Sequence, residues 1–180
     1  MPAEPLTIRP SERRDVAAIT AIYGWHVHHG TGTFELDAPD EAETARRRDA
    51  VLAGDLPWLV AEAGGEVVGY AYASRFRPRP AYHFCLEDSI YVAPGAQGRG
   101  VGRLLLAELL ARCQARGARQ MLAVIGDSAN LASIGLHRAQ GFAPVGLLAA
   151  AGWKFERWID VVIMQRALGT GADGAPASPR

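Results

Sequence analysis

Gln97-Gly98-Arg99-Gly100-Val101-Gly102 is a glycine-rich segment between two apolar stretches, Glu87 to Pro94 before it and Arg103 to Leu110 after it. The first stretch has the composition of a strand, and the second that of a helix. A glycine-rich loop at the start of a helix leaves backbone N–H groups free, and such a helix N-terminus favours anions, above all phosphates. We therefore expect this segment to hold a phosphorylated cofactor; a tight turn without a ligand is the alternative.

Two well-known phosphate motifs do not match this segment. A P-loop requires Gly-x-x-x-x-Gly-Lys-Ser/Thr, and no lysine follows these glycines. A dinucleotide fingerprint requires Gly-x-Gly-x-x-Gly early in a strand–helix–strand unit, with an acidic residue about 20 residues further on. Gly98, Gly100 and Gly102 have a different spacing and lie midway along the chain. The sequence therefore excludes both motifs.

The composition is that of an ordinary globular protein. The 180 residues are 49% hydrophobic and 21% charged, and the formal net charge is zero. Without an excess of positive charge, we expect neither nucleic acid nor an anionic membrane as a partner, and no apolar run reaches the roughly 20 residues that span a bilayer. We expect one domain over residues 1–168 and a disordered tail, residues 169–180, rich in Gly, Ala and Pro.

The N-terminus and the cysteines limit the compartment and the cofactors. Residues 1–5 lack the basic and apolar segments of an export signal, so we expect a cytoplasmic protein. Cys85 and Cys113 have no metal-ligand spacing and suggest no disulfide framework. We expect no bound metal.

Strands and helices are mixed along the chain. Strands are expected over residues 6–9, 58–63, 66–73, 84–92, 121–125 and 158–165, with Gly64-Gly65 as a hairpin turn. Helices are expected over residues 16–30, 40–53, 103–116 and 130–140. An early hairpin followed by strand–helix repeats predicts an α/β fold, with a mixed sheet and helices on both faces.

Two adjacent carboxylates, Glu87 and Asp88, interrupt the apolar strand before the glycine segment. Alternation along a strand places Glu87 on the same face as Cys85 and Asp88 on the opposite face. A buried carboxylate is costly without a partner, and burial raises its pKa toward the range of a general base. Glu87 is the stronger candidate for catalysis; the alternative is that nearby arginines pair with both carboxylates.

Histidines occur at two places of interest. His137 lies on the same face of a predicted helix as Asn130, two turns away, and is either a packing residue or an acid that titrates near neutral pH. His26, His28 and His29 cluster at the end of the first predicted helix, but nothing nearby completes a metal site. We interpret these three as solvent or interface residues.

Arginines and aromatic residues supply two further candidates. Residues 75–80 read Arg-Phe-Arg-Pro-Arg-Pro, which prolines make a loop. Its arginines are either solvated or a clamp for a substrate carboxylate, which a planar guanidinium suits. Trp153, Phe155 and Trp158 are interpreted as core or interface residues rather than a binding platform.

Several passages together carry a resemblance: Trp58 to Glu62, Gly69 to Ala73, Glu87 to Val92, Gln97 to Gly102, Ala123 to Arg138 and Gly152 to Asp160. In these passages the chain resembles the GNAT superfamily of N-acetyltransferases, and within it the branch of phosphinothricin and methionine sulfoximine acetyltransferases. The likeness covers residues 6–168, and the glycine segment matches the superfamily's Gln/Arg-x-x-Gly-x-Gly/Ala signature. It implies an α+β fold: a mixed, mostly antiparallel, seven-stranded sheet, splayed in the middle, with helices on both faces.

The resemblance also implies that acetyl-CoA is the cosubstrate. Its pantetheine would pair with the backbone of the strand, its pyrophosphate would lie on the glycine segment, and the last predicted helix would add contacts. The cofactor-binding residues implied in this way are Ile90, Tyr91, Val92, Gln97, Gly98, Arg99, Gly100, Val101, Gly102, Asn130 and Ser133.

For the chemistry, the resemblance implies direct acetyl transfer, in a ternary complex, to the amino group of a small amino-acid-like substrate that carries a carboxylate. Glu87 matches the base proposed in this branch, and His137 occupies the position of an acid for the departing thiolate. The positions that would contact the amine substrate are Phe34, Phe76, Arg77, Cys85 and Glu87. Members of the branch are usually homodimers, so we expect a homodimer. Since substrate-facing positions vary within the branch, the identity of the amine does not transfer.

Two other functions remain open. One is a non-catalytic acyl-CoA sensor, which the carboxylate retained at Glu87 disfavours. The other is an acetyltransferase for a protein N-terminus or a polyamine. A polyamine requires an acidic pocket, whereas the loop from Arg75 to Arg79 favours an anionic substrate.

Overall fold

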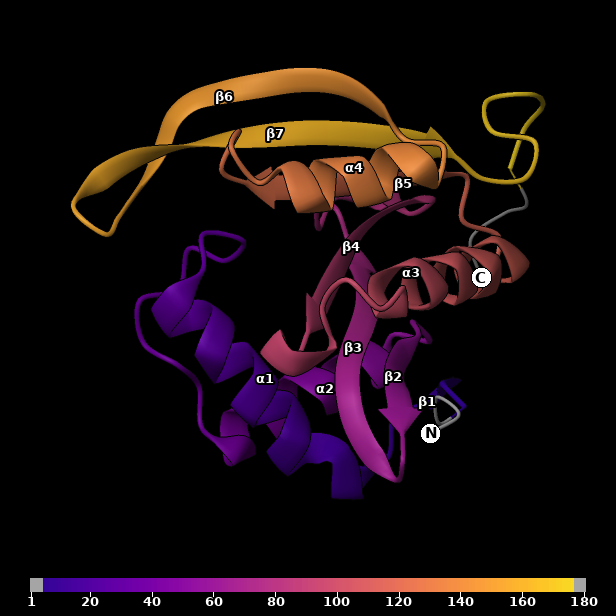
Figure 1. The fold of residues 1–180 in the computed structure, drawn as a ribbon. Helices are drawn as coiled ribbons and strands as arrows, with labels where there is room; N and C mark the ends of the chain where they lie inside the picture. Colours follow the sequence, from indigo (N-terminus) through magenta and orange to yellow (C-terminus); the bar gives the residue numbers. More distant parts are fainter. Residues whose placement is uncertain (1–4, 177–180) are drawn as a thin grey trace.

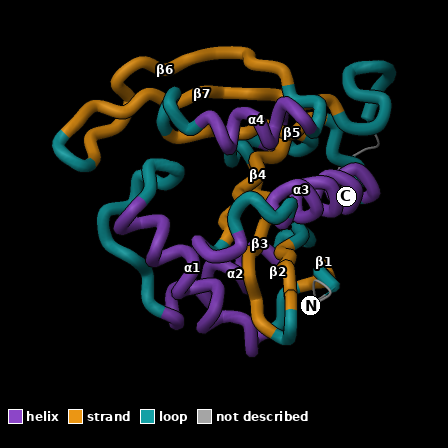
Figure 2. Tube along the Cα trace, in the orientation of Figure 1, coloured by secondary structure: helices purple, strands orange, loops and turns teal. Residues whose placement is uncertain are grey.

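A single seven-stranded sheet forms the centre of the molecule, in the order β1-β2-β3-β4-β5-β7-β6 (Figure 1, Figure 2). The computed structural model describes residues 5–176. Its strands are β1 (Thr7–Pro10), β2 (Trp58–Ala63), β3 (Glu66–Arg75), β4 (Cys85–Val92), β5 (Gln120–Gly126), β6 (Ala143–Lys154) and β7 (Arg157–Ala167). Its helices are α1 (Val16–His29), α2 (Glu41–Ala53), α3 (Val101–Ala115) and α4 (Leu131–Ala139), with 3-10 turns at Arg13–Asp15, Pro80–Tyr82 and Pro94–Ala96. The predicted α/β fold with a mixed, mostly antiparallel sheet is confirmed.

The sheet divides between β4 and β5, which run parallel, whereas the other neighbouring strands in residues 5–176 run antiparallel. Pairing between β4 and β5 begins at Cys85 with Gln120 and ends at Asp88 with Ala123. Both strands continue beyond that point, β4 to Val92 and β5 to Gly126. They therefore separate from one another, and the predicted splay in the middle of the sheet is confirmed.

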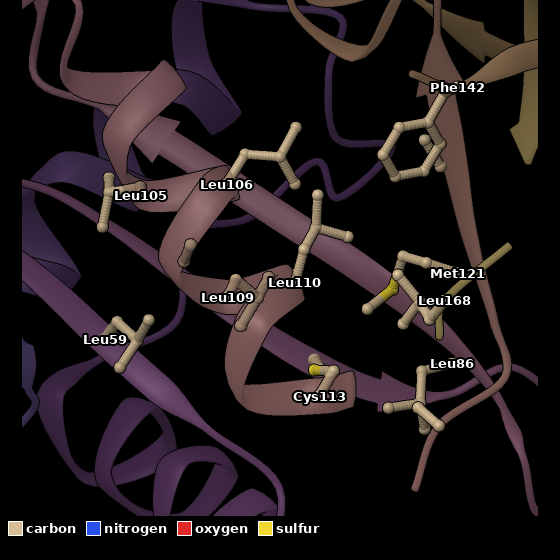
Figure 3. Packing of buried hydrophobic residues seen from close by; sticks show 14 of the residues in the cluster. Leu59, Leu86, Leu105, Leu106, Leu109, Leu110, Cys113, Met121, Phe142 and Leu168 are labelled. Atoms are coloured by element: carbon tan, nitrogen blue, oxygen red, sulfur yellow. The ribbon is translucent and has the colours of Figure 1, made fainter. Parts of the chain in front are cut away.

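On one face of the sheet, α3 supplies most of an aliphatic core. Leu105, Leu106 and Leu109 are completely buried and pack in one cluster with Leu86 and Met121 of the strands (Figure 3). Burying a leucine side chain contributes about 1.5–3 kcal/mol, so the apolar face of α3 holds the helix on the sheet. The glycine segment at its N-terminus is thereby held beside β4.

α1 lies on the opposite face of the sheet (Figure 1). It packs there on a group of aromatic side chains. Ile19 and Ile22 contact the cluster that contains Trp58, Tyr70 and Tyr91. The rings of Tyr70 and Tyr91 are stacked, with centroids 5.3 Å apart. The predicted helices on both faces are confirmed. The core is mainly aliphatic on the α3 face and largely aromatic on the α1 face.

The strand ranges expected from the sequence did not include one strand, β6. β6 lies at the edge of the sheet and pairs with β7. Most of its side chains are open to solvent: Val145 and Leu147 are each 56% exposed and Leu148 is 51% exposed. The segment is rich in leucine, alanine and glycine, which do not mark a strand, so its pairing with β7 in a hairpin decides its structure.

The residues after β7 turn back on the domain. Arg119 donates from Nε to the carbonyl of Gly171 at 2.7 Å and from Nη2 to that of Asp173 at 2.6 Å. The N–H of Gly169 donates to Gln114 Oε1 at 3.0 Å. The tail expected to be disordered thus begins with residues bonded to the domain, and residues 177–180 lie outside the described part of the chain. Within residues 5–176, no helix is long and apolar enough to cross a bilayer.

Candidate active site

The separation of β4 from β5 exposes backbone hydrogen-bonding groups in the middle of the sheet. Toward β3, the carbonyl of Cys85 and the N–H of Ala93 make backbone bonds of 3.3 and 2.9 Å. Since antiparallel pairs alternate, the odd-numbered residues of β4 bond to β3, and Ile90 and Val92 direct their N–H and C=O groups to the side that β5 has left. Buried backbone groups need partners, so this edge suits an extended, amide-containing ligand.

A cavity of about 760 Å³ follows this edge and continues to the start of α3 and α4. All of the predicted cofactor-binding residues line it except Arg99: Ile90, Tyr91, Val92, Gln97, Gly98, Gly100, Val101, Gly102, Asn130 and Ser133. Gly98 and Gly100 have φ of 73° and 81°, and a Cβ at either would have no neighbour within 4 Å. The glycines are thus required by backbone conformation, and the space beside them is open for phosphate to reach the N–H groups of the loop.

The start of α4 forms the other wall of the phosphate end of the cavity. Asn130 is the N-cap of α4 and accepts from the N–H of Ser133 at 3.2 Å. Its amide also reaches the carbonyl of Gly126, at the end of β5, at 3.4 Å. The cap therefore ties α4 to β5 and leaves the remaining N–H groups of the first turn for an anion.

Glu87 lines the cavity from the face of β4 that α1 covers. Tyr91, which lies on the same face of the strand, belongs to the aromatic core under α1. Burial, followed by repulsion from Asp88, raises the pKa of Glu87 above its ordinary value, and the attraction of Arg77 opposes this only in part. A carboxyl group of this kind can exchange a proton with an amine closer to neutral pH.

Asp88 points to the other face of the sheet and meets His137 of α4. His137 Nε2 lies 3.0 Å from Asp88 Oδ1, and its Nδ1 lies 2.8 Å from the carbonyl of Ser133. Because a carbonyl only accepts, Nδ1 carries a proton, and Nε2 shares one with the carboxylate. Burial lowers the pKa of His137, but the Asp88 carboxylate outweighs it, so the pKa lies above its ordinary value.

This buried pair lines the cavity on the side opposite Glu87, and sequence reasoning missed it. Both side chains are at most 5% exposed, and Asp88 Oδ2 has no hydrogen-bond partner within residues 5–176. The alternative that an arginine pairs with Asp88 is wrong. The signal was present in the strand alternation, which directs Asp88 to the face where His137 packs.

Most of the predicted amine-contacting residues do not line the cavity. Of these five, Glu87 is a lining residue, whereas Phe34, Phe76, Arg77 and Cys85 are not. The guanidinium of Arg77 lies 4.6 Å from the centre of the Phe76 ring. Burial and then the charge of Glu87 raise the pKa of the Cys85 thiol.

The end of α1 and the loop after it also line the cavity, which the sequence did not indicate. His26 Nε2 lies 2.9 Å from the carbonyl of Val92, and burial lowers the pKa of His26, with that hydrogen bond opposing. Trp25, His26, His29 and residues 30–33 line the cavity. The interpretation of His26 as a solvent or interface residue is therefore wrong, whereas His28 and His29 are exposed, as expected. Within the described residues, no group of three or more His, Cys, Asp or Glu could hold a metal ion.

Comparisons with known proteins find relatives over most of the chain. The model of the Acetyltransferase (GNAT) family matches residues 19–142. A phosphinothricin N-acetyltransferase of Alcaligenes faecalis is 52% identical over 94% of this chain and 86% of its own. An L-methionine sulfoximine/L-methionine sulfone acetyltransferase of Pseudomonas paraeruginosa is 39% identical over 88% of this chain and 92% of its own. The crystal structure of a GNAT superfamily phosphinothricin acetyltransferase from Sinorhizobium meliloti in complex with acetyl-CoA matches with a TM-score of 0.93 and 47% identity, over 96% of this chain and 93% of that one.

Proposed function

The chain belongs to the GNAT family of acetyltransferases and is an N-acetyltransferase that uses acetyl-CoA, and we propose that its acceptor is the α-amino group of a small amino acid of the phosphinothricin or methionine sulfoximine type. One observation carries the proposal. The opening between β4 and β5 has the glycine loop on one side of the sheet and the Glu87 carboxyl on the other. A donor and an acceptor that enter from opposite faces meet at this opening, and holding two reactants together supplies much of the rate.

The residues present fit acetyl-CoA. The N–H groups of the loop from Gly98 to Gly102 and of the first turn of α4 would hold its pyrophosphate. Backbone groups of Ile90 and Val92 would bond to the amides of its pantetheine arm. When bound, the cosubstrate supplies the acetyl group as a thioester.

Glu87 acts as the base in the proposed reaction. It receives the proton that the ammonium group of the amino acid must lose before the nitrogen can attack, directly or through a water molecule. Its raised pKa brings the carboxyl closer to neutral pH, where a base is effective. The N–H of Val92 donates to the carbonyl oxygen as negative charge develops on it.

His137 acts on the other side of the opening as the acid. The thiolate that leaves needs a proton, and the proton held between His137 Nε2 and Asp88 Oδ1 lies at the cavity wall. The carboxylate raises the pKa of His137 against the effect of burial, so the pair keeps this proton to a higher pH than a free histidine would.

The acceptor pocket is assigned to the face of the sheet under α1. Arg77, whose positive charge opposes the rise in the pKa of Glu87, would hold the carboxylate of an amino acid whose nitrogen faces Glu87. Phe34, Phe76 and Cys85 would surround the side chain of the substrate. Acetylation of such an amino acid, an inhibitor or an antibiotic, would detoxify it in the cytoplasm.

A second copy of this chain is proposed to cover β6. An open edge strand with exposed apolar side chains readily pairs with another strand, and Leu147, Trp153 and Trp158 are 56%, 56% and 63% exposed. We expect a homodimer in analytical ultracentrifugation and a monomer for Leu147→Glu. A wild-type protein that sediments as a monomer at micromolar concentration contradicts this assignment.

The function is tested by measuring thiol release from acetyl-CoA with a panel of amines. We expect release with L-phosphinothricin, L-methionine sulfoximine or L-methionine sulfone, and none with putrescine or an alanyl peptide. Release with the last two alone would refute the substrate class, and acetyl-CoA binding without any release would identify a sensor.

The role of Glu87 is tested by Glu87→Gln, with Glu66→Gln, an exposed carboxylate of β3, as the control. We expect kcat to fall by about 100-fold or more in the first variant, within the range of acid–base groups, and to stay unchanged in the second. A Glu87→Gln enzyme with the kcat and pH profile of the wild type removes Glu87 from the mechanism.

A further inference from the structure

Lys154 is the single lysine in a sequence with 19 basic residues, and it is buried. Its side chain is bonded to two backbone carbonyls: Nζ donates to Gly30 at 2.9 Å and to Thr33 at 2.8 Å. No salt bridge joins it to a carboxylate within residues 5–176, and the residue is only 4% exposed. A charged group is costly to bury, so this arrangement requires a specific benefit.

The two carbonyls belong to the loop between α1 and α2, which forms a wall of the cavity. Gly30 to Thr33 line the cavity at the end of α1. Lys154 lies in the β6–β7 hairpin, whose free end bends toward this loop (Figure 1). The bonds therefore join the edge of the sheet to the wall of the site, across 121 positions in the sequence.

Further contacts fix the position of the loop of residues 30–34. The Phe34 ring lies where a Cβ at Gly152 of the hairpin would be, and the carbonyl of Thr31 lies where a Cβ at Gly126 would be. From the other side, the Thr33 hydroxyl bonds to the Tyr23 hydroxyl at 2.8 Å. The loop thus fits closely between α1, the end of β5 and the hairpin.

We infer that Lys154 is a positioning residue, which holds the loop of residues 30–34 as a wall of the acceptor pocket and so sets the affinity for the amine. An ammonium group suits this task because it has three N–H donors and is compact, whereas an apolar side chain would leave both carbonyls without their partner. Burial lowers the pKa of Lys154, with the charge of Glu35 opposing, as expected for a group held away from water. The inference rests on the proposed function for its kinetic consequence.

Steady-state kinetics of Lys154→Met and Lys154→Gln test the inference. We expect the KM for the amine to rise about tenfold in Lys154→Met, or about 1.4 kcal/mol, while the KM for acetyl-CoA changes by less than about twofold. Lys154→Gln keeps N–H donors and should recover part of the loss. Arg13→Met is the control, since it removes an exposed basic side chain.

A second measurement does not depend on turnover. Because the chain has one lysine, a protein labelled with ¹⁵N at lysine Nζ has one such signal. We expect this ammonium group to exchange its protons slowly at neutral pH, and the amides of residues 31–34 to exchange faster in Lys154→Met than in the wild type. Fast exchange of the Nζ protons in the wild type refutes the inference that Lys154 holds the loop.

The outcomes separate the two claims. If the wild type releases no thiol with any amine, the proposed function fails. The exchange data alone then decide whether Lys154 holds the loop. If the wild type is active and both variants keep its KM for the amine, the inference is wrong. If Lys154→Met does not fold, Lys154→Gln and the exchange measurement decide.

Discussion

Replacing Asp88 with asparagine isolates the charge of the buried Asp88–His137 pair, since the two side chains are similar in size. In the wild type the pair is joined at 3.0 Å, and both side chains are at most 5% exposed. In Asp88→Asn the histidine loses its counter-charge and becomes neutral, while Nδ1–H can still donate to Ser133. Disrupting a buried pair of this kind costs about 1–3 kcal/mol, so we expect the free energy of unfolding to fall by this amount in mildly acidic solution.

The pH dependence of this loss has a definite sign. Burial lowers the pKa of His137, but the carboxylate raises it more, so the folded value lies above the unfolded value of about 6.5. The contribution of the pair to stability is therefore fully present below about pH 6.5 and is lost as the pH rises through the folded pKa. One pKa unit corresponds to about 1.4 kcal/mol. The difference in stability between wild type and Asp88→Asn should therefore narrow as the solution becomes alkaline.

Urea unfolding of both proteins between about pH 5 and about pH 9 measures this difference. Subtracting one curve from the other removes the contributions of groups that the two proteins share. His26 is one of them: burial lowers its pKa, so its effect on stability has the opposite sign. Parallel curves, with the same difference at every pH, would show that His137 carries no extra proton in the folded protein and would refute the argument.

Three further predictions follow from the cavity walls. Gly100→Ala places a Cβ at φ 81°, so we expect about 1–2 kcal/mol of lost stability and weaker acetyl-CoA binding by calorimetry; unchanged binding contradicts the role of the loop. Asn130→Ala removes the cap of α4 and should cost about 1 kcal/mol, read as a lower Tm; an unchanged Tm contradicts the cap. The kcat of the wild type should fall as the pH drops through the raised pKa of Glu87, and Glu87→Gln should abolish this acidic limb.

Local patterns predicted most of the fold. The strand and helix that flank the glycine segment were expected from apolar runs and from the loop itself, and β4 and α3 lie there. β6 is different, because its leucine and alanine residues favour no strand and its partner β7 follows it in the chain. Such a strand is defined by its pairing within the β6–β7 hairpin, which its own residue types do not indicate.

The same distinction applies to the site. Gly98 and Gly100 adopt positive φ within the loop itself, so the phosphate end of the cavity could be expected from residue types alone. The contact between Asp88 and His137 spans 49 positions, and neither residue type specifies the other as its partner. His26 was interpreted as a surface residue because only the folded chain places it against the carbonyl of Val92.

Glu87 and Asp88 show how one strand can serve two reactants. Successive side chains of a strand point to opposite faces, and at Asp88 the pairing of β4 with β5 ends. Glu87 therefore faces the α1 side, where burial raises its pKa as a base requires, while Asp88 faces α4 and keeps a proton on His137. A glutamate at position 88 would reach further toward α4 and disturb the 3.0 Å contact, whereas an aspartate at position 87 would withdraw the carboxyl from the acceptor. In the proposed reaction, Glu87 receives the proton of the amine on one side of the sheet, and the Asp88–His137 pair gives a proton to the thiolate on the other. The two proton transfers are kept apart because the neighbouring side chains differ in length and point to opposite faces.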